Sequence, residues 1–400
     1  MRVLLTMSVL VLLVASVSAT ETRVMTMGDN NTILLDEHNI TIFPSRLYDY
    51  PNLAIAEFSN NDFTKFGVHW KFNEDKPWIL GVYLHNGTPS DAAFNPIDLP
   101  SRLGSYTDMS NQRMDMYYAR MLGDSKFGFH FGLVHSSAKH DTDVLKDESA
   151  FSTYRFDVGV TPKDNKYDVS AGLDFMSYTD KETYNDGTNV TAVDVTEPDG
   201  NMGFYFMTRM FHQIDVKTVF VPHAGIRYGK YSSNYYDETG DTMLTSVENK
   251  VIAIDLGVGM QYTPTENVLA VLDFGLSYDN VTTDSYYPLD TLGVEDKNKV
   301  TSLPYIKMGL DAEVFKWMDV RFGATSYWDS ETEETNYDNI VIKHTYKYPE
   351  NETYLGFGFH WNDLHVDVYS NPEMFLDGFN FLSGSTNNMN FRISAVYEML

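Results

Sequence analysis

Charged side chains that could bind or steer a solute recur at every second position of extended-looking stretches in this 400-residue chain. Between residues 151 and 178, for example, Arg155 and Asp157 flank the apolar Phe156. Because successive side chains of a β-strand point to opposite faces, one face of such a strand is charged and the other is apolar. A soluble sandwich shows the same alternation, so its meaning depends on how the pattern repeats along the chain.

The alternation places a set of charged and histidine residues on one common face, and we expect them to line a pore. Rings and patches of charge in a wet pore select which ions and solutes pass. The alternative is that these residues pair with one another and fill the interior. The pore-lining candidates are Lys65, His69, Lys71, Asp115, His130, Arg155, Asp157, Asp174, Arg209, Lys217, His223, Arg227, Asp255, Asp273, Lys307, Asp311, Arg321, His365, Asp367 and Arg392.

Two further features of the strands favour a curved wall around a lumen. Many positions on the polar face are glycines, which leave space beside the backbone. Aromatic residues near the expected strand ends would form the girdle that a membrane barrel places at its interfaces. These aromatic residues are Trp70, Trp78, Tyr167, Tyr262, Tyr305, Trp317 and Trp361.

The connections between the expected strands fall into a short and a long class. About sixteen strands of roughly ten residues can be placed, with fourteen as the alternative count. Short turns alternate with longer connections at 87–111, 136–150, 179–201, 229–249, 279–299, 329–353 and 370–388. This asymmetry predicts an all-β, antiparallel, up-and-down transmembrane barrel with short periplasmic turns and long extracellular loops. Segment 87–111 is our first candidate for a loop that folds inward and narrows the lumen.

The N-terminus has the features of an export signal. Arg2 precedes an apolar run over residues 3–17, and Val17-Ser18-Ala19 fits the small-x-small cleavage rule. The alternative, a membrane anchor, is disfavoured because the run is shorter than the ~20 residues that span a bilayer. The sequence therefore predicts a signal peptide over 1–19, a periplasmic or plug segment over 20–49 and a barrel over 50–400.

The repeat from residue 50 onward resembles the outer-membrane β-barrels of Gram-negative bacteria, of the porin kind. The last residues, Phe391-Arg392-Ile393-Ser394-Ala395-Val396-Tyr397-Glu398-Met399-Leu400, resemble the final strand of such barrels, although the chain ends in Leu where an aromatic residue is usual. The resemblance implies an outer-membrane location, contact with lipid and passive diffusion of small hydrophilic solutes or ions. It leaves a homo-oligomer open.

A second resemblance concerns residues 27–47. Met27-Gly28, followed by Phe43-Pro44-Ser45-Arg46-Leu47, is similar to the start of FadL-like transporters of hydrophobic compounds, where a Met-Gly stretch precedes an Asn-Pro-Ala-Gly-Leu-like segment. Arg46 stands where that family has Gly. This resemblance implies a channel for hydrophobic compounds as an alternative function. A third alternative is a non-transporting surface or surface-layer barrel that binds partners through acidic loops.

Composition and motifs exclude several other classes. The formal net charge of −27 disfavours binding of nucleic acid, and the absence of cysteine excludes disulfides and thiol chemistry. No Gly-x-Ser-x-Gly, His-Glu-x-x-His or phosphate loop is present, so we expect no enzyme and no cofactor. The one weak hydrolase candidate groups His135 and His140 with Asp141 and Asp143. Acidic stretches at 180–199, 237–241, 284–296 and 329–334 could recruit calcium, although no metal site is predicted.

Overall fold

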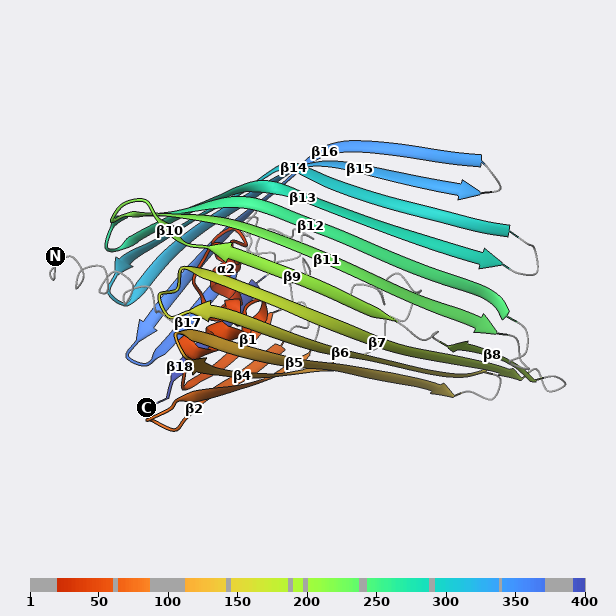
Figure 1. The fold of residues 1–400 in the computed structure, drawn as a ribbon, viewed down its shortest axis with the longest axis horizontal. Helices are drawn as coiled ribbons and strands as arrows, with labels where there is room; N and C mark the ends of the chain where they lie inside the picture. The colour runs from red at the N-terminus through yellow and green to blue at the C-terminus, as the bar shows by residue number, and fades with distance from the viewer. Residues whose placement is uncertain are drawn as a thin grey trace, which may run out of the picture.

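The chain folds as a closed barrel of antiparallel strands. The computed structural model describes residues 20–59, 64–86, 112–141, 145–185, 190–196, 201–236, 243–287, 292–337, 340–370 and 391–399. Each main strand pairs with its neighbours in sequence, and β1 closes the barrel by pairing with both β2 and β18 (Figure 1). The barrel has 16 strands, so the fold prediction is confirmed and the alternative count of fourteen is wrong.

The strands and helices have the following bounds. The strands are β1 Leu53–Ser59, β2 Thr64–Phe72, β3 Trp78–Asn86, β4 Gln112–Leu122, β5 Ser125–Asp141, β6 Leu145–Pro162, β7 Tyr167–Asn185, β8 Val190–Thr196, β9 Met202–Met210, β10 His212–Gln213, β11 Thr218–Tyr236, β12 Met243–Thr265, β13 Val268–Tyr287, β14 Leu292–Phe315, β15 Met318–Tyr337, β16 Ile340–Trp361, β17 Leu364–Ser370 and β18 Phe391–Glu398. The helical elements are α2 Glu21–Thr26, η1 Glu37–Thr41 and η2 Pro44–Asp49. Strands β8 and β9 occupy one place in the barrel, because each pairs with both β7 and β11. The two-residue β10 is a short extra strand beside β11, which leaves 16 strands in the barrel.

Several connections that were expected to be loops are continuations of the strands. Strands β15 and β16 pair without a break across the expected loop 329–353. The pairing starts where Met318 faces Phe359 and ends where Tyr337 faces Ile340. The expected loops 136–150, 229–249 and 279–299 are likewise largely paired. Strand lengths were underestimated because the prediction ended each strand at the membrane thickness, whereas antiparallel pairing continues beyond it. Segment 87–111, with its expected constriction, and residues 371–390 lie outside the described residues.

The two faces of the wall differ as the alternation predicted. The outer face exposes apolar side chains such as Phe129, Phe156 and Phe274. The inner face carries buried polar residues such as Asp157 and Arg209. A wall that is apolar outside and polar inside fits a bilayer-spanning barrel. Separately, no helix among the described residues is long and apolar enough to cross a membrane.

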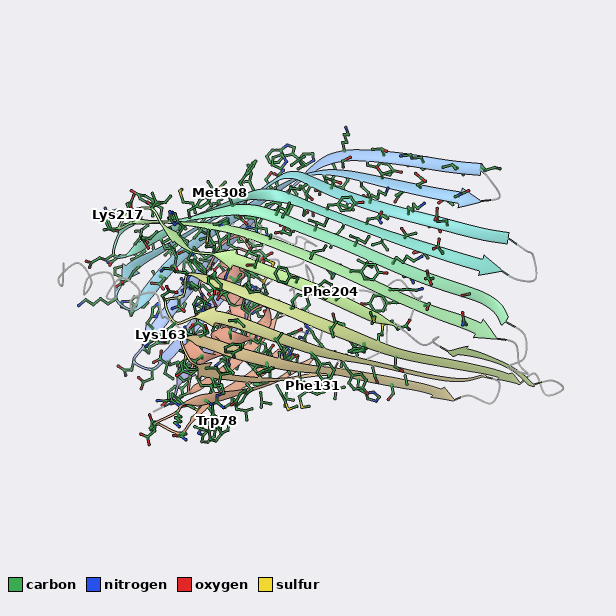
Figure 2. The ribbon with its side chains drawn as sticks, in the orientation of Figure 1. Trp78, Phe131, Lys163, Phe204, Lys217 and Met308 are labelled. Carbon is green, nitrogen blue, oxygen red and sulfur yellow. The ribbon has the colours of Figure 1, made fainter. Side chains whose placement is uncertain are left out.

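Aromatic residues cluster near the short-turn end of the outer face. Phe315, Trp317, Phe359 and Trp361 stack in succession with ring centroids 5.5, 6.2 and 5.7 Å apart. In Figure 2, Trp78, Lys163 and Lys217 also lie toward this end of the barrel. Tyr305 is an exception to the expected girdle.

Tyr305 was wrongly assigned to that girdle, because its side chain is buried and faces inward. The reason is its spacing of two residues from the inward-facing Lys307, which fixes both side chains on the same face of β14. Strand β14 also begins well before Tyr305, at Leu292, so this tyrosine is not near a strand end.

Residues 20–49, which we call the plug, fold inside the short-turn half of the barrel (Figure 1). Helix α2 contacts β15 to β18, and η2 contacts β3 to β6, so the plug touches opposite walls. Ile40 and Leu47 of the plug pack with Leu53, Ile55 and Ile79 of the wall in one buried apolar cluster. The plug is thus held within the barrel by apolar packing and by the polar contacts described below.

The apolar outer face makes a prediction about charge. Phe274 is 49% exposed and lies six residues after Val268, where β13 begins. We expect Phe274→Arg to lower the free energy of unfolding in lipid vesicles by about 2–4 kcal/mol, the usual cost of a cation on a lipid-facing strand. Tyr346→Arg, on the extended part of β16, should cost less than about 1 kcal/mol. If urea titrations showed the same loss of unfolding free energy in both variants, then Phe274 would not face the bilayer.

Candidate functional site

The pore-lining candidates lie on the inner wall, with one exception. Lys217 is exposed in the short turn that precedes β11, where its amine donates to the carbonyl oxygen of Pro264 at 2.6 Å. It was wrongly placed on an inner face because β11 begins at Thr218, after this residue. The other candidates occupy inward-facing positions, where many of them contact the plug or each other. Their role in lining a conducting pore stays a prediction.

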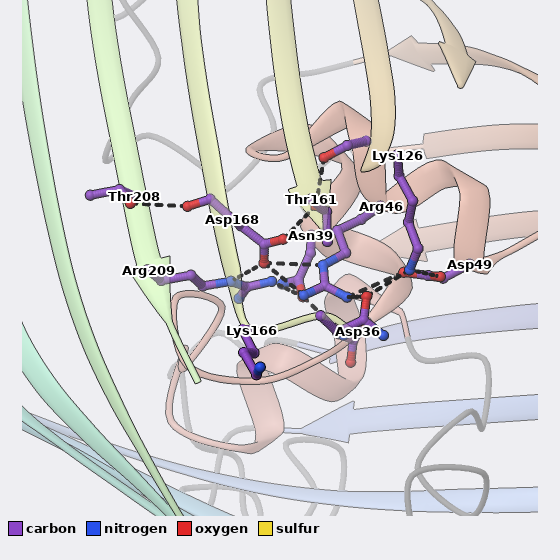
Figure 3. Close-up of polar contacts among 12 residues, drawn as sticks. Asp36, Asn39, Arg46, Asp49, Lys126, Thr161, Lys166, Asp168, Thr208 and Arg209 are labelled. Carbon is purple, nitrogen blue, oxygen red and sulfur yellow. Dashed lines mark hydrogen bonds and ion pairs between the residues drawn. The ribbon is translucent and has the colours of Figure 1, made fainter. Parts of the chain in front are cut away.

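Arg209 of β9 makes the most extensive contacts between wall and plug (Figure 3). Its Nε donates to Asp168 Oδ2 at 2.8 Å, and Nη1 donates to the carbonyl oxygens of Thr32 and Leu34, each at 2.9 Å. Nη1 also reaches the Asn31 carbonyl at 3.2 Å, and Nη2 donates to Asn39 Oδ1 at 2.8 Å. This buried guanidinium therefore holds the segment before η1 against β9. Only the planar fork of arginine supplies donors in so many directions at once.

Arg46 of η2 shares the same wall carboxylate. Its Nη2 lies 2.9 Å from Asp168 Oδ2, so one buried aspartate pairs with one arginine of the wall and one of the plug. Close by, Ser45 Oγ lies 2.8 Å from Thr161 Oγ1, and Lys126 pairs with Asp49. Asp168 is not in the list of pore-lining candidates, but it lies six residues before the candidate Asp174 on β7, and this even spacing places both on the same face.

A second group of charges surrounds α2 on the opposite wall. Arg23 of the plug lies 3.1 Å from Asp36 and 3.1 Å from Asp311 of β14. Arg321 of β15 also pairs with Asp311, at 3.2 Å, and with Asp367 of β17. The hydroxyl of Thr20 donates to Asp367 at 2.9 Å.

The barrel seam supplies a third group of charges. Arg392 of β18 pairs with Glu21 of the plug. Lys65 of β2 lies 3.0 Å from Glu57 of β1 and 3.7 Å from Glu21. The backbone N–H of Glu21 also donates to Glu57 Oε1 at 3.0 Å. Buried charges are tolerated only when they are paired, so these contacts join the plug to the strands that close the barrel.

Glu37 of η1 is the plug carboxylate with the most unusual setting. It accepts a hydrogen bond from the hydroxyl of Tyr83, on β3, and that hydroxyl also lies 2.6 Å from His69 Nε2. Burial raises the pKa of Glu37 to about 7, while the charge of Lys65 and the Tyr83 hydrogen bond partly offset that rise. This pKa places Glu37 to change charge near neutral pH.

Glycines of the inner wall give the plug its room. A Cβ on Gly128 would lie 2.1 Å from the backbone of Pro44, which is closer than atoms can approach. Within the plug, Gly28 has φ +76°, and a Cβ there would meet the Met308 carbonyl oxygen at 2.3 Å. The inner-face glycines thus allow the plug backbone to lie directly on the wall, a role that the sequence did not reveal.

Histidine–carboxylate groups line the wall beyond these contacts. His130 lies 2.7 Å from Asp115 and 2.5 Å from Asp157. His223 lies 3.0 Å from Asp273 and 3.1 Å from Asp255. Among the described residues, no group of His, Asp and Glu is arranged to hold a metal ion. The possible calcium sites stay a prediction, because much of the acidic sequence lies outside the described side chains.

The weak hydrolase candidate has little structural support in the described residues. His135 Nδ1 lies 2.9 Å from the hydroxyl of Ser152, across the β5–β6 pair. The side chains of His140, Asp141 and Asp143 lie outside the described part of the chain. The absence of an enzyme stays an expectation.

Sequence reasoning missed the plug side of the site. It did not single out Glu21, Arg23 or Glu37, because a short irregular segment has no period that separates buried from exposed charges. The available signal was Arg46, which departs from glycine in the FadL-like stretch and which the structure pairs with Asp168.

Comparison with known proteins found similar solved structures at low sequence identity. No family model and no curated protein matches this chain. Among solved structures, the toluene transporter TodX of Pseudomonas putida is 12% identical, with 96% of this chain and 99% of that chain covered and a TM-score of 0.40. The ferric-catecholate import receptor Fiu of E. coli K12 is 8% identical, with coverages of 86% and 81% and a TM-score of 0.33. CdiB of Acinetobacter baumannii is 8% identical, with coverages of 86% and 59% and a TM-score of 0.38.

The barrel fold is shown by the strand pairing of this chain itself. At these identities and TM-scores, the comparison carries no argument about what passes through this barrel.

The contacts of Arg209 make a prediction about plug stability. Arg209→Lys keeps the charge beside Asp168 but removes donors from the carbonyls of Thr32 and Leu34. We expect it to destabilise the seated plug by about 1–3 kcal/mol, the cost of leaving a buried polar group unpaired. Faster hydrogen exchange over residues 31–39, measured by mass spectrometry, would show this loss.

The matched control for this test is Arg227→Lys on β11. Arg227 also faces inward, and it lies 3.8 Å from Asp279 of the wall. It should leave exchange over residues 31–39 unchanged. Equal acceleration in both variants would mean that Arg209 does not hold the plug.

Proposed function

We propose that this chain is an outer-membrane channel for small polar solutes, held closed by the plug at rest. The observation that carries the proposal is the set of buried charges by which the plug is joined to opposite walls of a polar-lined barrel. The export signal that the sequence predicts and the apolar outer face support placement in the outer membrane. The proposal departs from an open porin in one respect, because the plug must rearrange before solute passes.

The chemistry of the inner wall favours a polar solute. Around and beyond the plug contacts, the wall presents carboxylates and imidazoles such as Asp157, His130 and His223. Such a surface compensates a polar solute for the water that it loses, whereas a hydrocarbon gains nothing from it. We propose no enzymatic role and no cofactor for this site.

One observation favours the alternative, a channel for hydrophobic compounds. Met27, Ile33 and Leu34 of the plug pack with Val221 and Val271 of the wall in a buried apolar cluster. A path that opened between these residues would be apolar. The two functions therefore differ in where the plug separates from the wall.

A disulfide lock tests whether the plug gates the channel. Ser45 Oγ and Thr161 Oγ1 are 2.8 Å apart, and the chain has no cysteine of its own. We expect Ser45→Cys with Thr161→Cys to abolish solute-induced conductance in planar bilayers when oxidised, and to regain it on reduction. Testing uptake of small sugars and of aromatic hydrocarbons separates the polar from the apolar proposal.

The matched control joins two strands of the wall instead. Ser326 Oγ and Asn351 Oδ1 are 2.6 Å apart in the β15–β16 pair. Ser326→Cys with Asn351→Cys should leave conductance unchanged in either redox state. If the oxidised plug lock conducts as well as this control, then solute passes without movement of the plug near Ser45, and the gating proposal fails.

A further inference from the structure

Three side chains form a buried chain of contacts between η1 and the wall. His69 Nδ1 lies 2.6 Å from the carbonyl oxygen of Tyr50, and His69 Nε2 lies 2.6 Å from the hydroxyl of Tyr83. The same hydroxyl contacts Glu37 Oε1. His69, Tyr83 and Glu37 are each no more than 2% exposed. We call these three residues the η1 triad.

The protons available to the η1 triad can be counted. The carbonyl oxygen of Tyr50 only accepts, so His69 Nδ1 must carry a proton. The Tyr83 hydroxyl has a single proton, yet it lies between two acceptors, His69 Nε2 and Glu37 Oε1. Two contacts need two donated protons, and Tyr83 supplies one of them. The second proton must reside on Glu37 or on His69 Nε2.

Both placements of the second proton satisfy every contact along the chain. With the proton on Glu37, the acid donates to Tyr83 Oη and Tyr83 donates to a neutral His69. With the proton on His69, the imidazolium donates to Tyr83 Oη and Tyr83 donates to a carboxylate. The triad therefore titrates as one unit that holds one extra proton. Without that proton, two acceptors face each other in a site that excludes water.

The charges around the triad come from several elements. Lys65 of β2 has its amine 5.7 Å from the centre of the Tyr83 ring, and it is paired with Glu57 of β1 and Glu21 of α2. On η1 itself, His38 follows Glu37 and Asp36 precedes it. Asp36 is paired with Arg23. From β4, the ring centroid of Tyr117 lies 5.7 Å from that of Tyr83.

The remaining oxygen of Glu37 favours the carboxylic acid form. Its Oε2 is buried and has no hydrogen-bond partner in the described part of the chain. A buried carboxylate oxygen without a hydrogen-bond partner loses its hydration without compensation. Burial of the neutral carboxylic acid costs far less free energy.

We propose that the η1 triad is a proton-binding latch, which holds the plug to β2 and β3 while it keeps its extra proton and weakens when that proton is lost. This latch deepens the proposed gating by the plug, but proton binding by the triad can be measured without any transport.

The direction of the pH effect follows from linkage. The pKa of Glu37 in the seated plug is about 7, against an ordinary value of 4.5. Between these two values the seated plug binds a proton that the released segment gives up, so rising pH favours release. One proton changes the release equilibrium by at most about tenfold per pH unit. Release should therefore increase from about pH 4.5 to about pH 7 and level off above.

Hydrogen exchange over residues 36–50 of the full chain tests the latch. Protection factors, which correct for the intrinsic dependence of exchange on pH, should fall by up to about tenfold per unit between pH 5 and pH 7. In Glu37→Gln the amide donates to Tyr83 Oη and Tyr83 donates to His69, so every contact is satisfied without a titrating proton. Its protection should not change with pH. Glu74→Gln alters an exposed carboxylate beside Lys71 and should keep the wild-type slope.

Infrared spectroscopy reads the proton directly in the wild-type chain, and needs no variant to fold. A carboxylic acid carbonyl band should be present at pH 5, disappear as the pH passes about 7, and be missing from Glu37→Gln. The latch proposal would be overturned if the wild-type protection factors did not change with pH. It would also be overturned if Glu37→Gln kept the wild-type dependence of protection on pH. Failure of the disulfide lock to close the channel would instead overturn the gating proposal and leave these results standing.

Discussion

The pairing of buried charge is the constraint on which this structure depends. Asp168 of the wall lies between Arg46 of the plug and Arg209 of β9, and none of the three is exposed to bulk water. Removing one partner of a buried pair costs about 3–5 kcal/mol, because the other charge is left without compensation. Plug and wall therefore require each other, and the barrel interior is complete only when both are present.

The same constraint limits how the plug can move. Its polar contacts join three parts of the barrel: β7 and β9 through Arg46 and Arg209 respectively, β14 through Arg23, and the seam through Glu21. Releasing the whole plug breaks all of these pairs together, whereas a local change breaks only a few. A change confined to one side of the plug is thus far less costly than its expulsion. The η1 triad lies at one such side, where contact depends on a proton and not on a fixed pair of ions.

Much of the wall could be predicted from sequence, because a period of two is a strong local signal. The spacing of Arg155 and Asp157 placed both on the inner face, and the structure agrees. Local signals were less able to give strand length. Strand pairing such as that of Tyr337 with Ile340 continues beyond the thickness of a membrane. The length of such a strand depends on its partner strand, which the local sequence pattern does not identify.

The plug contacts could not be predicted, because they join residues far apart in sequence. Thr20 meets Asp367, and Arg209 meets Leu34, with no shared period or motif to relate them. The inner-face glycines were predicted to leave space beside a lumen. At Gly128 this space is instead occupied by the backbone of Pro44. Arg46, a charged residue within the otherwise irregular segment 20–49, was the remaining clue to a buried partner.

Zero-length carbodiimide cross-linking of the unaltered chain in outer membranes tests most directly that the plug occupies the barrel. Lys307 Nζ of β14 lies 3.3 Å from Asp29 Oδ2, and Lys126 of β5 pairs with Asp49. The wall pair Lys71–Glu74 should react in any case and controls for the chemistry. We expect mass spectrometry to find amide links from Lys307 to Asp29 and from Lys126 to Asp49. If Lys71 and Glu74 are linked while Asp29 and Asp49 carry only unlinked products, then residues 20–49 do not lie inside the barrel and the account is wrong.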